Sequence, residues 1–107
     1  MREFTTGAVR DDEGDKPDYT ILPLEAFPRL ARHLSANEAK YGRHNYQKGI
    51  PVSACARSAF RHLVAWTCGD KSEDHLAAAA VNLLFAIYMQ EMHEGRRDIN
   101  NDPRCVK

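Results

Sequence analysis

Three consecutive ionisable residues, Glu73, Asp74 and His75, stand immediately before a long apolar stretch of the chain. Carboxylate oxygens suit Mg²⁺ or Mn²⁺, which typically keep several waters and bridge to the phosphates of a substrate. The position of the two carboxylates also has a structural explanation, because the first turn of a helix favours negative charge. Glu73 and Asp74 are therefore candidate metal ligands for which a structural role remains an alternative.

Glu38 is a third candidate ligand because it interrupts an apolar stripe. The apolar residues recur at i, i+3 and i+4, as on one face of a helix, and they are Phe27, Leu30, Ala31, Leu34 and Tyr41. A core-facing carboxylate is costly unless it is paired or bound to a metal, so we expect Glu38 to share a metal with the two later carboxylates. Two alternatives are an ion pair with Arg57 or Arg61 and a capping box over residues 35–38.

Cations opposite these carboxylates would complete a site for a metal-bound triphosphate, because guanidinium groups bind phosphate oxygens bidentately. Each cation could instead be a solvated surface residue. The candidates are Arg10, Lys16, Lys40, Arg57 and Arg61.

His75 and Asn82 are two polar residues at the start and in the middle of the apolar stretch. His75 has a structural explanation as a hydrogen-bonded core histidine. Asn82 must find hydrogen-bond partners or lose about 1–3 kcal/mol, so it either links helices or contacts a substrate. The two residues are seven apart and share one helix face, which we expect to look into a pocket rather than a dry core.

Three helices are expected to position these residues, and the first carries Glu38. It runs from about residue 23 to Tyr41, or begins near Phe27, because Pro28 interrupts its start. Residues 42–51 contain Gly, Asn and Pro and are expected to form a loop.

The second expected helix begins with Ser53 as its N-cap and ends near Gly69. Arg57 and Arg61, four residues apart, would lie along one edge of its core face. That face is expected to consist of Ala56, Phe60, Leu63, Val64 and Thr67.

The third expected helix is capped by Ser72 and runs to about His93. It is apolar around its whole circumference, which indicates a central position in a bundle. Four consecutive alanines, residues 77–80, would let a neighbouring helix approach closely. Three helices in so short a chain hardly cover a central helix, so we expect a homo-dimer or homo-tetramer to complete the bundle.

The expected fold class is all-α, because no stretch shows strand alternation, an internal repeat or a hairpin signal. One domain would span residues 1–107. It would comprise a polar arm over residues 1–20, a helical core over residues 21–94 and a polar tail over residues 95–107.

Composition argues against several classes of protein. Fifteen basic and fifteen acidic residues cancel, so no net charge would attract nucleic acid or an anionic membrane. The apolar run 76–89 is shorter than the roughly 20 residues of a membrane span, and the N-terminus shows no signal-peptide pattern. Cys55, Cys68 and Cys105 lack metal-type spacing and are odd in number, which indicates reduced thiols. We therefore expect a cytoplasmic protein.

Four segments, in this order and with these gaps, resemble the N-terminal domain of phage dATP/dGTP diphosphohydrolases. They are "GAVRDDEGDKPDYTILPLEAF", "KYGRHNYQKGIP", "SAFRHLVAW" and "HLAAAAVNLLF", and they cover most of the chain from Gly7 to about Leu84. Each segment is weak alone, but the combination is specific. The matching polar residues include Arg10, Asp11, Lys16, Lys40, Asn45, Arg61, His62, His75 and Asn82.

The sequence departs from the family pattern in two places and from a related pattern in a third. Tyr46 replaces a Trp beside Asn45, and Ala78 replaces a second His. The family is also similar to MazG-like all-α nucleotide pyrophosphohydrolases, which carry a Glu-x-x-Glu pair on the first helix, whereas here Tyr41 stands three residues after Glu38. Asp70, Glu73 and Asp74 therefore compete to be the remaining acids.

The resemblance implies a MazG-like bundle and a Mg²⁺-dependent or Mn²⁺-dependent enzyme that cleaves dATP or dGTP between the α and β phosphates. Glu38 with Glu73 or Asp74 would hold the metal, and Arg61 with Lys16 or Lys40 would balance the phosphate charge. Asn45, Tyr46 or Asn82 would meet the base or sugar, and Asp11, Arg57, His62 and His75 would also line the substrate site. If the chain is phage-encoded, the reaction would take place in the host cytoplasm.

Two other functions fit the departures. The first is a non-catalytic helical protein that binds a nucleotide or a protein partner. The second is a structural oligomerisation module, for which the Glu38→Gln substitution would alter stability alone.

Overall fold

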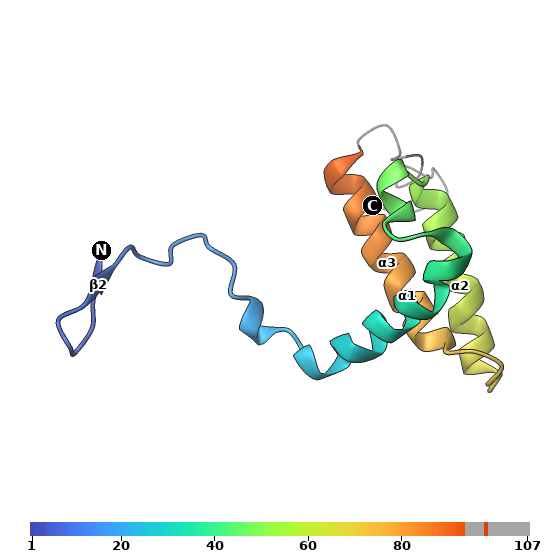
Figure 1. Ribbon diagram of the computed structural model, residues 1–107, viewed down its shortest axis with the longest axis horizontal. Coiled ribbons are helices and arrows are strands. Elements are labelled where there is room, and N and C mark those ends of the chain that lie inside the picture. The colour runs from blue at the N-terminus through green and yellow to red at the C-terminus, as the bar shows by residue number, and fades with distance from the viewer. Residues whose placement is uncertain (94–97, 99–107) are drawn as a thin grey trace, which may run out of the picture.

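The computed structural model describes residues 1–93 and 98, and it shows an extended arm followed by three packed helices (Figure 1). The helices are α1 Phe27–Tyr41, α2 Val52–Thr67 and α3 His75–Met92. Short 3-10 helices are η1 Tyr19–Ile21, η2 Leu24–Ala26 and η3 Asn45–Lys48. The mainly helical class is thus confirmed.

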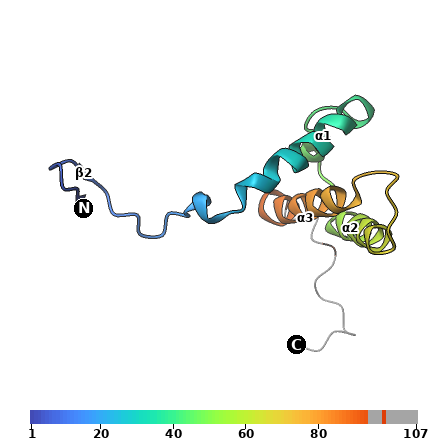
Figure 2. The ribbon, with the colours of Figure 1, turned by 90° about the horizontal axis from the view of Figure 1, so that it is seen from below.

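The arm contains a small hairpin that the sequence did not predict. Strand β1, Arg2–Glu3, pairs antiparallel with β2, Val9–Arg10, so that Arg2 lies opposite Arg10. Strands of two residues are too short to show alternation, which explains why the all-α expectation was wrong at this point. The arm then leads away from the helices, as both ribbon views show (Figures 1 and 2).

Helix α1 begins at Phe27, the later of the two expected starts. Pro28 occupies the first turn, where its missing N–H removes no intrahelical hydrogen bond. None of the α1 residues is buried in the single chain, although Leu30 and Glu38 are half-buried. The apolar stripe of α1 is therefore only partly covered.

Helix α2 differs from expectation at its start and in its inward face. Ser53 is not its N-cap: Pro51 holds that position, and the Ser53 N–H donates to the Asp98 carboxylate at 2.9 Å. The core-facing residues are the small or narrow Val52, Cys55 and Ala59, whereas Phe60 and Val64 are 68% and 62% exposed. The expected core face was therefore wrong in rotation about the helix axis.

The end of α2 agrees with expectation. The helix ends at Thr67, and Gly69 follows with φ 83°, a backbone conformation that glycine adopts without steric cost. The N–H groups of Gly69 and Asp70 donate to carbonyls of the last turn, which closes the helix. The chain can then turn sharply toward α3.

Helix α3 is capped by Asp74 rather than by Ser72. An Asp74 carboxylate oxygen accepts the Ala77 N–H at 3.2 Å. Because α3 begins at His75, both Glu73 and Asp74 precede the helix instead of occupying its first turn. The Glu73 carboxylate is therefore positioned by the loop, and the Asp74 carboxylate by its capping interaction.

Helix α3 lies between the other two helices and packs mainly against α2 (Figure 2). Ala77, Ala78 and Ala79 are buried, as close helix approach requires, and Met89 is fully buried. In the single chain, the C-terminal half of α3 is less covered apart from Met89. There Leu83, Leu84 and Ile87 are each at least half exposed.

Other expectations concern cysteines, membranes and the tail. Cys55 and Cys68 are free thiols, the first buried and the second exposed. Within the described part of the chain, no helix has the length and apolarity to cross a membrane. Cys105 and most of the expected tail, 95–97 and 99–107, lie outside the described residues.

Candidate metal centre

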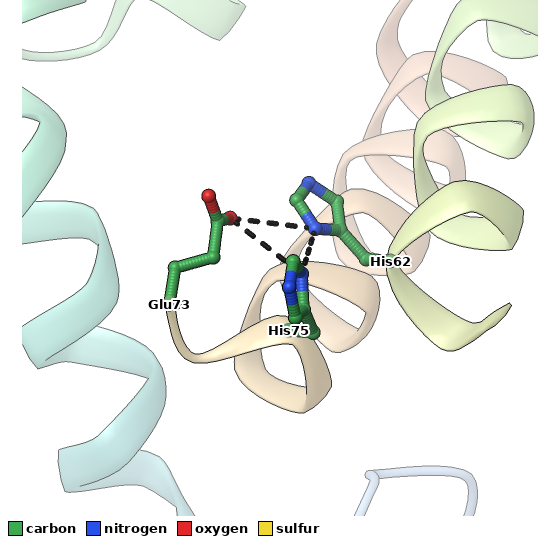
Figure 3. A group of neighbouring side chains, drawn as sticks. All are labelled: His62, Glu73 and His75. Atoms are coloured by element: carbon green, nitrogen blue, oxygen red, sulfur yellow. Dashed lines mark hydrogen bonds and ion pairs between the residues drawn. The ribbon is translucent and has the colours of Figure 1, made fainter. Parts of the chain in front are cut away.

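Three side chains from α2, the α2–α3 loop and the start of α3 converge on one point (Figure 3). His62 comes from α2, Glu73 from the loop, and His75 is the first residue of α3. Two antiparallel helices joined by a short loop necessarily bring the end of one beside the start of the other. The local fold thus explains how residues 62 and 75 meet.

The facing atoms are two imidazole nitrogens and one carboxylate oxygen. His62 Nδ1 lies 2.9 Å from His75 Nδ1 and 3.4 Å from Glu73 Oε1. His75 Nδ1 and Glu73 Oε1 are 3.8 Å apart. Imidazole and carboxylate are both common ligands of divalent metal ions.

The cluster is closed on one side and open on the other. His75 is only 8% exposed, whereas the side chains of His62 and Glu73 are 23% and 52% exposed. His75 Nε2 is buried and makes no hydrogen bond, although an Asp70 carboxylate oxygen lies 3.2 Å away. A ligand could therefore reach the cluster from the Glu73 side.

Electrostatics favour an uncharged His62. Burial lowers the pKa of the His62 imidazole, and the nearby Glu73 carboxylate partly opposes this effect. A neutral imidazole has a free lone pair, which is the form that binds a metal.

Asp74, an expected metal ligand, is engaged elsewhere. Its two carboxylate oxygens accept hydrogen bonds from Arg29 Nε and Nη2 at 2.7 Å and 2.6 Å. These bonds lower the pKa of Asp74 to about 2. Arg29, which the sequence analysis did not single out, thereby links α1 to the cap of α3.

Glu38, the other expected ligand, is paired with Arg43. Arg43 Nε and Nη2 donate to its carboxylate at 2.9 Å and 3.2 Å, which makes the contact an ion pair as well. These bonds lower the pKa of Glu38, whose side chain is 41% exposed. The structure therefore departs from both stated alternatives, a partner on α2 and a capping box.

The expected all-carboxylate set is not brought together. Among residues 1–93 and 98, the one group of three candidate ligand side chains comprises His62, Glu73 and His75. Of the expected trio, Glu73 alone belongs to it. Glu38 and Asp74 are bound by Arg43 and Arg29 instead, although Asp74 lines the same pocket as Glu73 and His75.

A pocket of about 530 Å³ lies beside the cluster, a volume suited to a small molecule. Arg29 and Lys71 supply positive charge to its wall, and Trp66 supplies an aromatic surface. Glu73 and His75 also line it. The expectation that His75 faces a pocket is thus met, whereas Asn82 is absent from the lining and donates to the Ala78 carbonyl of its own helix at 2.8 Å.

The other candidate substrate residues lie away from this pocket. Arg10, Asp11 and Lys16 line a separate hollow in the arm. Lys40 lies over the Tyr41 ring, and Tyr46 stacks on Phe85 with ring centroids 5.0 Å apart. The remaining three, which do not line the pocket, are Asn45 in η3 and the exposed Arg57 and Arg61 on α2.

Every member of the cluster is a candidate on sequence grounds, but the sequence alone does not group them. His62 and His75 both match the family pattern, and Glu73 was chosen as an acid. A helix of expected length ending near Gly69 would have placed His62 two turns from its end, close to the start of the next helix. This spacing could have predicted that His62 and His75 lie close together.

A known protein family matches most of the chain. Residues 6–99 match the family described as "dATP/dGTP diphosphohydrolase, N-terminal". No curated protein and no solved structure matches the chain. The family match covers most of the sequence and includes all three residues of the cluster, so the chain belongs to the dATP/dGTP diphosphohydrolase N-terminal domain family.

Proposed function

We propose that this protein is a nucleoside triphosphate diphosphohydrolase that converts dATP or dGTP to the monophosphate and pyrophosphate. The observation that carries the proposal is the family match over residues 6–99, which contains the His62, Glu73 and His75 cluster. A divalent cation, Mg²⁺ or Mn²⁺, is its proposed cofactor. Of the expected ligands Glu38, Glu73 and Asp74, two are bound by arginines in the single chain, so Glu38 and Asp74 would have to exchange these partners to hold the ion.

The pocket beside the cluster supports triphosphate binding. Arg29 and Lys71 would meet phosphate oxygens, and Trp66 offers a flat surface for a purine. A water oxygen would bond to the α-phosphorus and lose a proton to solvent while the bond from that phosphorus to the bridging oxygen breaks. Pyrophosphate would leave with that oxygen and its electron pair.

The remaining candidate substrate residues are proposed contributors. Arg10, Asp11 and Lys16 would contribute from the arm. The others would contact the substrate from the helical part of the chain. They are Lys40, Asn45, Tyr46, Arg57, Arg61 and Asn82.

The test is hydrolysis of each of the four dNTPs with Mg²⁺ or Mn²⁺, followed by detection of both pyrophosphate and dNMP. We expect release of the two products in equal amounts, fastest with dATP or dGTP. Release of inorganic phosphate and dNDP, or no turnover at high enzyme concentration, would contradict the proposal.

The Glu73→Gln variant tests the role of the cluster in hydrolysis, because it keeps the shape of an exposed side chain while removing its charge. We expect kcat/KM to fall by roughly 10-fold to 100-fold or more, as for loss of a group around a catalytic metal. Glu91→Gln is the matched control, because Glu91 is an exposed residue of α3 outside the cluster.

Nucleotide binding without turnover is a second candidate function. It is favoured by Ala78, which is buried where the family pattern has a second His. Equilibrium binding of dNTPs with no product after prolonged incubation would select this function. A third alternative, the structural oligomerisation module, predicts no dNTP binding at all.

We also propose that the chain forms a homo-oligomer, a dimer or a tetramer. Phe60 and Val64 on α2, and Leu83, Leu84 and Ile87 on α3, are exposed in the single chain. Large exposed apolar side chains at helical spacing are typical of surfaces between subunits. Light scattering after size exclusion should give a multiple of the monomer mass, and a monomer at high concentration would contradict this proposal.

A further inference from the structure

We propose that His62, Glu73 and His75 form a site for a transition-metal ion of the Zn²⁺ or Mn²⁺ class, which binds there in preference to Mg²⁺. The inference deepens the proposed function by naming the ion of its site. Binding by the protein alone can test it, so it stands or falls separately from hydrolysis.

The three facing atoms have the separation that such an ion needs. Their distances of 2.9, 3.4 and 3.8 Å define a triangle. The point equidistant from its corners lies about 2.0 Å from each, which matches typical Zn–N and Zn–O bond lengths. An ion could therefore bind with small side-chain movements.

The donor types decide which ion fits. Two imidazole nitrogens and one carboxylate oxygen suit Zn²⁺, Mn²⁺ and other first-row ions, whereas Mg²⁺ is usually held by oxygen. Asp74 cannot readily supply a second carboxylate, because Arg29 binds both of its oxygens. The site therefore carries the chemistry of a nitrogen-rich centre.

Asp70 would orient His75 from behind. It lies 3.2 Å from His75 Nε2, the ring nitrogen that faces away from the cluster. A carboxylate there favours a proton on Nε2 and leaves the Nδ1 lone pair directed at the cluster, the arrangement found around histidines that bind metals. A small ring rotation on metal binding would also give the buried Nε2 its missing hydrogen bond.

Three protein ligands leave room for others. In zinc enzymes, three side chains hold the ion and an open position accepts water or substrate. Here the open side carries the half-exposed Glu73 and borders the pocket with Arg29 and Lys71. The site therefore resembles an open metal site that can bind water or substrate, rather than a closed structural site.

The experiment titrates the full-length protein with Zn²⁺, Mn²⁺, Co²⁺ or Mg²⁺ alone, without nucleotide. We expect one equivalent of Zn²⁺ to raise Tm by several degrees and Mg²⁺ to bind at least 100-fold more weakly. Co²⁺ should give visible absorption without a thiolate charge-transfer band, which separates this site from binding at the exposed Cys68.

Variants then assign the ligands. His62→Gln and Glu73→Gln should each weaken Zn²⁺ binding by at least 10-fold, and Asp70→Asn should weaken it by about 10-fold to 100-fold. His44→Asn is the control, because it removes a histidine outside the cluster and keeps a residue tolerant of its left-handed backbone. Circular dichroism of each variant verifies the fold, and the buried His75 is left intact for that reason.

The outcomes are distinguishable. Equal affinity for Mg²⁺ and Zn²⁺, or unchanged Zn²⁺ binding in His62→Gln and Glu73→Gln, would overturn the inference. Selective Zn²⁺ or Mn²⁺ binding without any dNTP turnover would support the inference while contradicting the proposed reaction. Turnover with Mg²⁺, without binding of the other ions that depends on the cluster, would support the proposed reaction and contradict the inference.

Discussion

Asp74 combines two interactions in one side chain. Its carboxylate caps α3 through the Ala77 N–H and holds Arg29 of α1 through both oxygens. The cap and the ion pair should respond differently to replacement of Asp74 by asparagine. The asparagine amide can still accept the capping hydrogen bond, but it carries no charge for the ion pair.

Substitution should separate these two contributions. Asp74→Ala removes both, and loss of the cap alone should cost about 1 kcal/mol of unfolding free energy. Asp74→Asn keeps a capping oxygen and should destabilise less than Asp74→Ala. Urea denaturation measures both variants, and equal losses would show that the cap contributes nothing.

Acid should weaken the same contact over a defined pH range. Arg29 lowers the pKa of Asp74 from 3.8 to about 2, so the folded protein releases this proton more readily than the unfolded chain. The resulting stabilisation is present above pH 3.8 and is lost as the pH falls toward 2. We expect the difference in Tm between the wild type and Arg29→Met to shrink across this range, and a constant difference would contradict the assignment.

The individual site residues were predictable, but their partners were not. Glu73, His62 and His75 could be chosen from residue type and family pattern. Arg29 and Arg43 lie on positions that look solvated in the sequence, and they removed Asp74 and Glu38 from the expected metal site. Such pairings depend on rotation and docking of helices, which periodicity leaves undetermined.

The pairing of α2 with α3 is the main packing contact of the helical core. Val52, Cys55 and Ala59 of α2 and the alanines 77–79 of α3 are buried, and Met89 near the C-terminal end of α3 is fully buried. The Ile50 N–H also points at the Met89 sulfur at 3.2 Å. Met89 therefore anchors the loop before α2 as well as α3.

Met89→Ala should destabilise the protein strongly. Removal of a fully buried methionine side chain leaves a cavity and typically costs about 2–5 kcal/mol. Met92→Ala is the control on the same helix, because Met92 is 65% exposed and its loss should change stability by about 0.5 kcal/mol or less. Similar Tm values for the two variants would contradict the packing seen around Met89.

Helix boundaries followed from the sequence better than helix faces did. Pro28, Gly42 and Gly69 mark the ends where the structure has them. The inward face of α2 differs from the expected one because Val52, Cys55 and Ala59 are buried, whereas Phe60 and Val64 are exposed. Neither expected serine cap forms: Pro51 holds the N-cap position of α2, and Asp74 caps α3 through the nearby Ala77 N–H.

The molecule extends 55 Å along its longest axis because the arm leaves the helical core (Figure 1). Every residue from 1 to 20 is exposed, and the hairpin packs on itself. The arm therefore contributes little to the stability of the three helices in a single chain.

Removal of residues 1–20 should leave Tm nearly unchanged and reduce dNTP hydrolysis. The first result follows from the exposure of the arm, and the second from the proposed contributions of Arg10 and Lys16. The full-length Arg10→Ala/Lys16→Ala variant controls for effects of truncation. A large fall in Tm would show that the arm stabilises the fold, and unchanged kcat/KM would exclude it from catalysis.

The short connection between α2 and α3 has a consequence for the order of folding. His62 and His75 are thirteen residues apart, whereas Arg29 and Asp74 are separated by forty-five. Contacts close in sequence form faster than distant ones, so the cluster should assemble as soon as the α2–α3 hairpin forms. An ion captured at that stage would slow reopening of the hairpin and give α1 a persistent surface on which to dock.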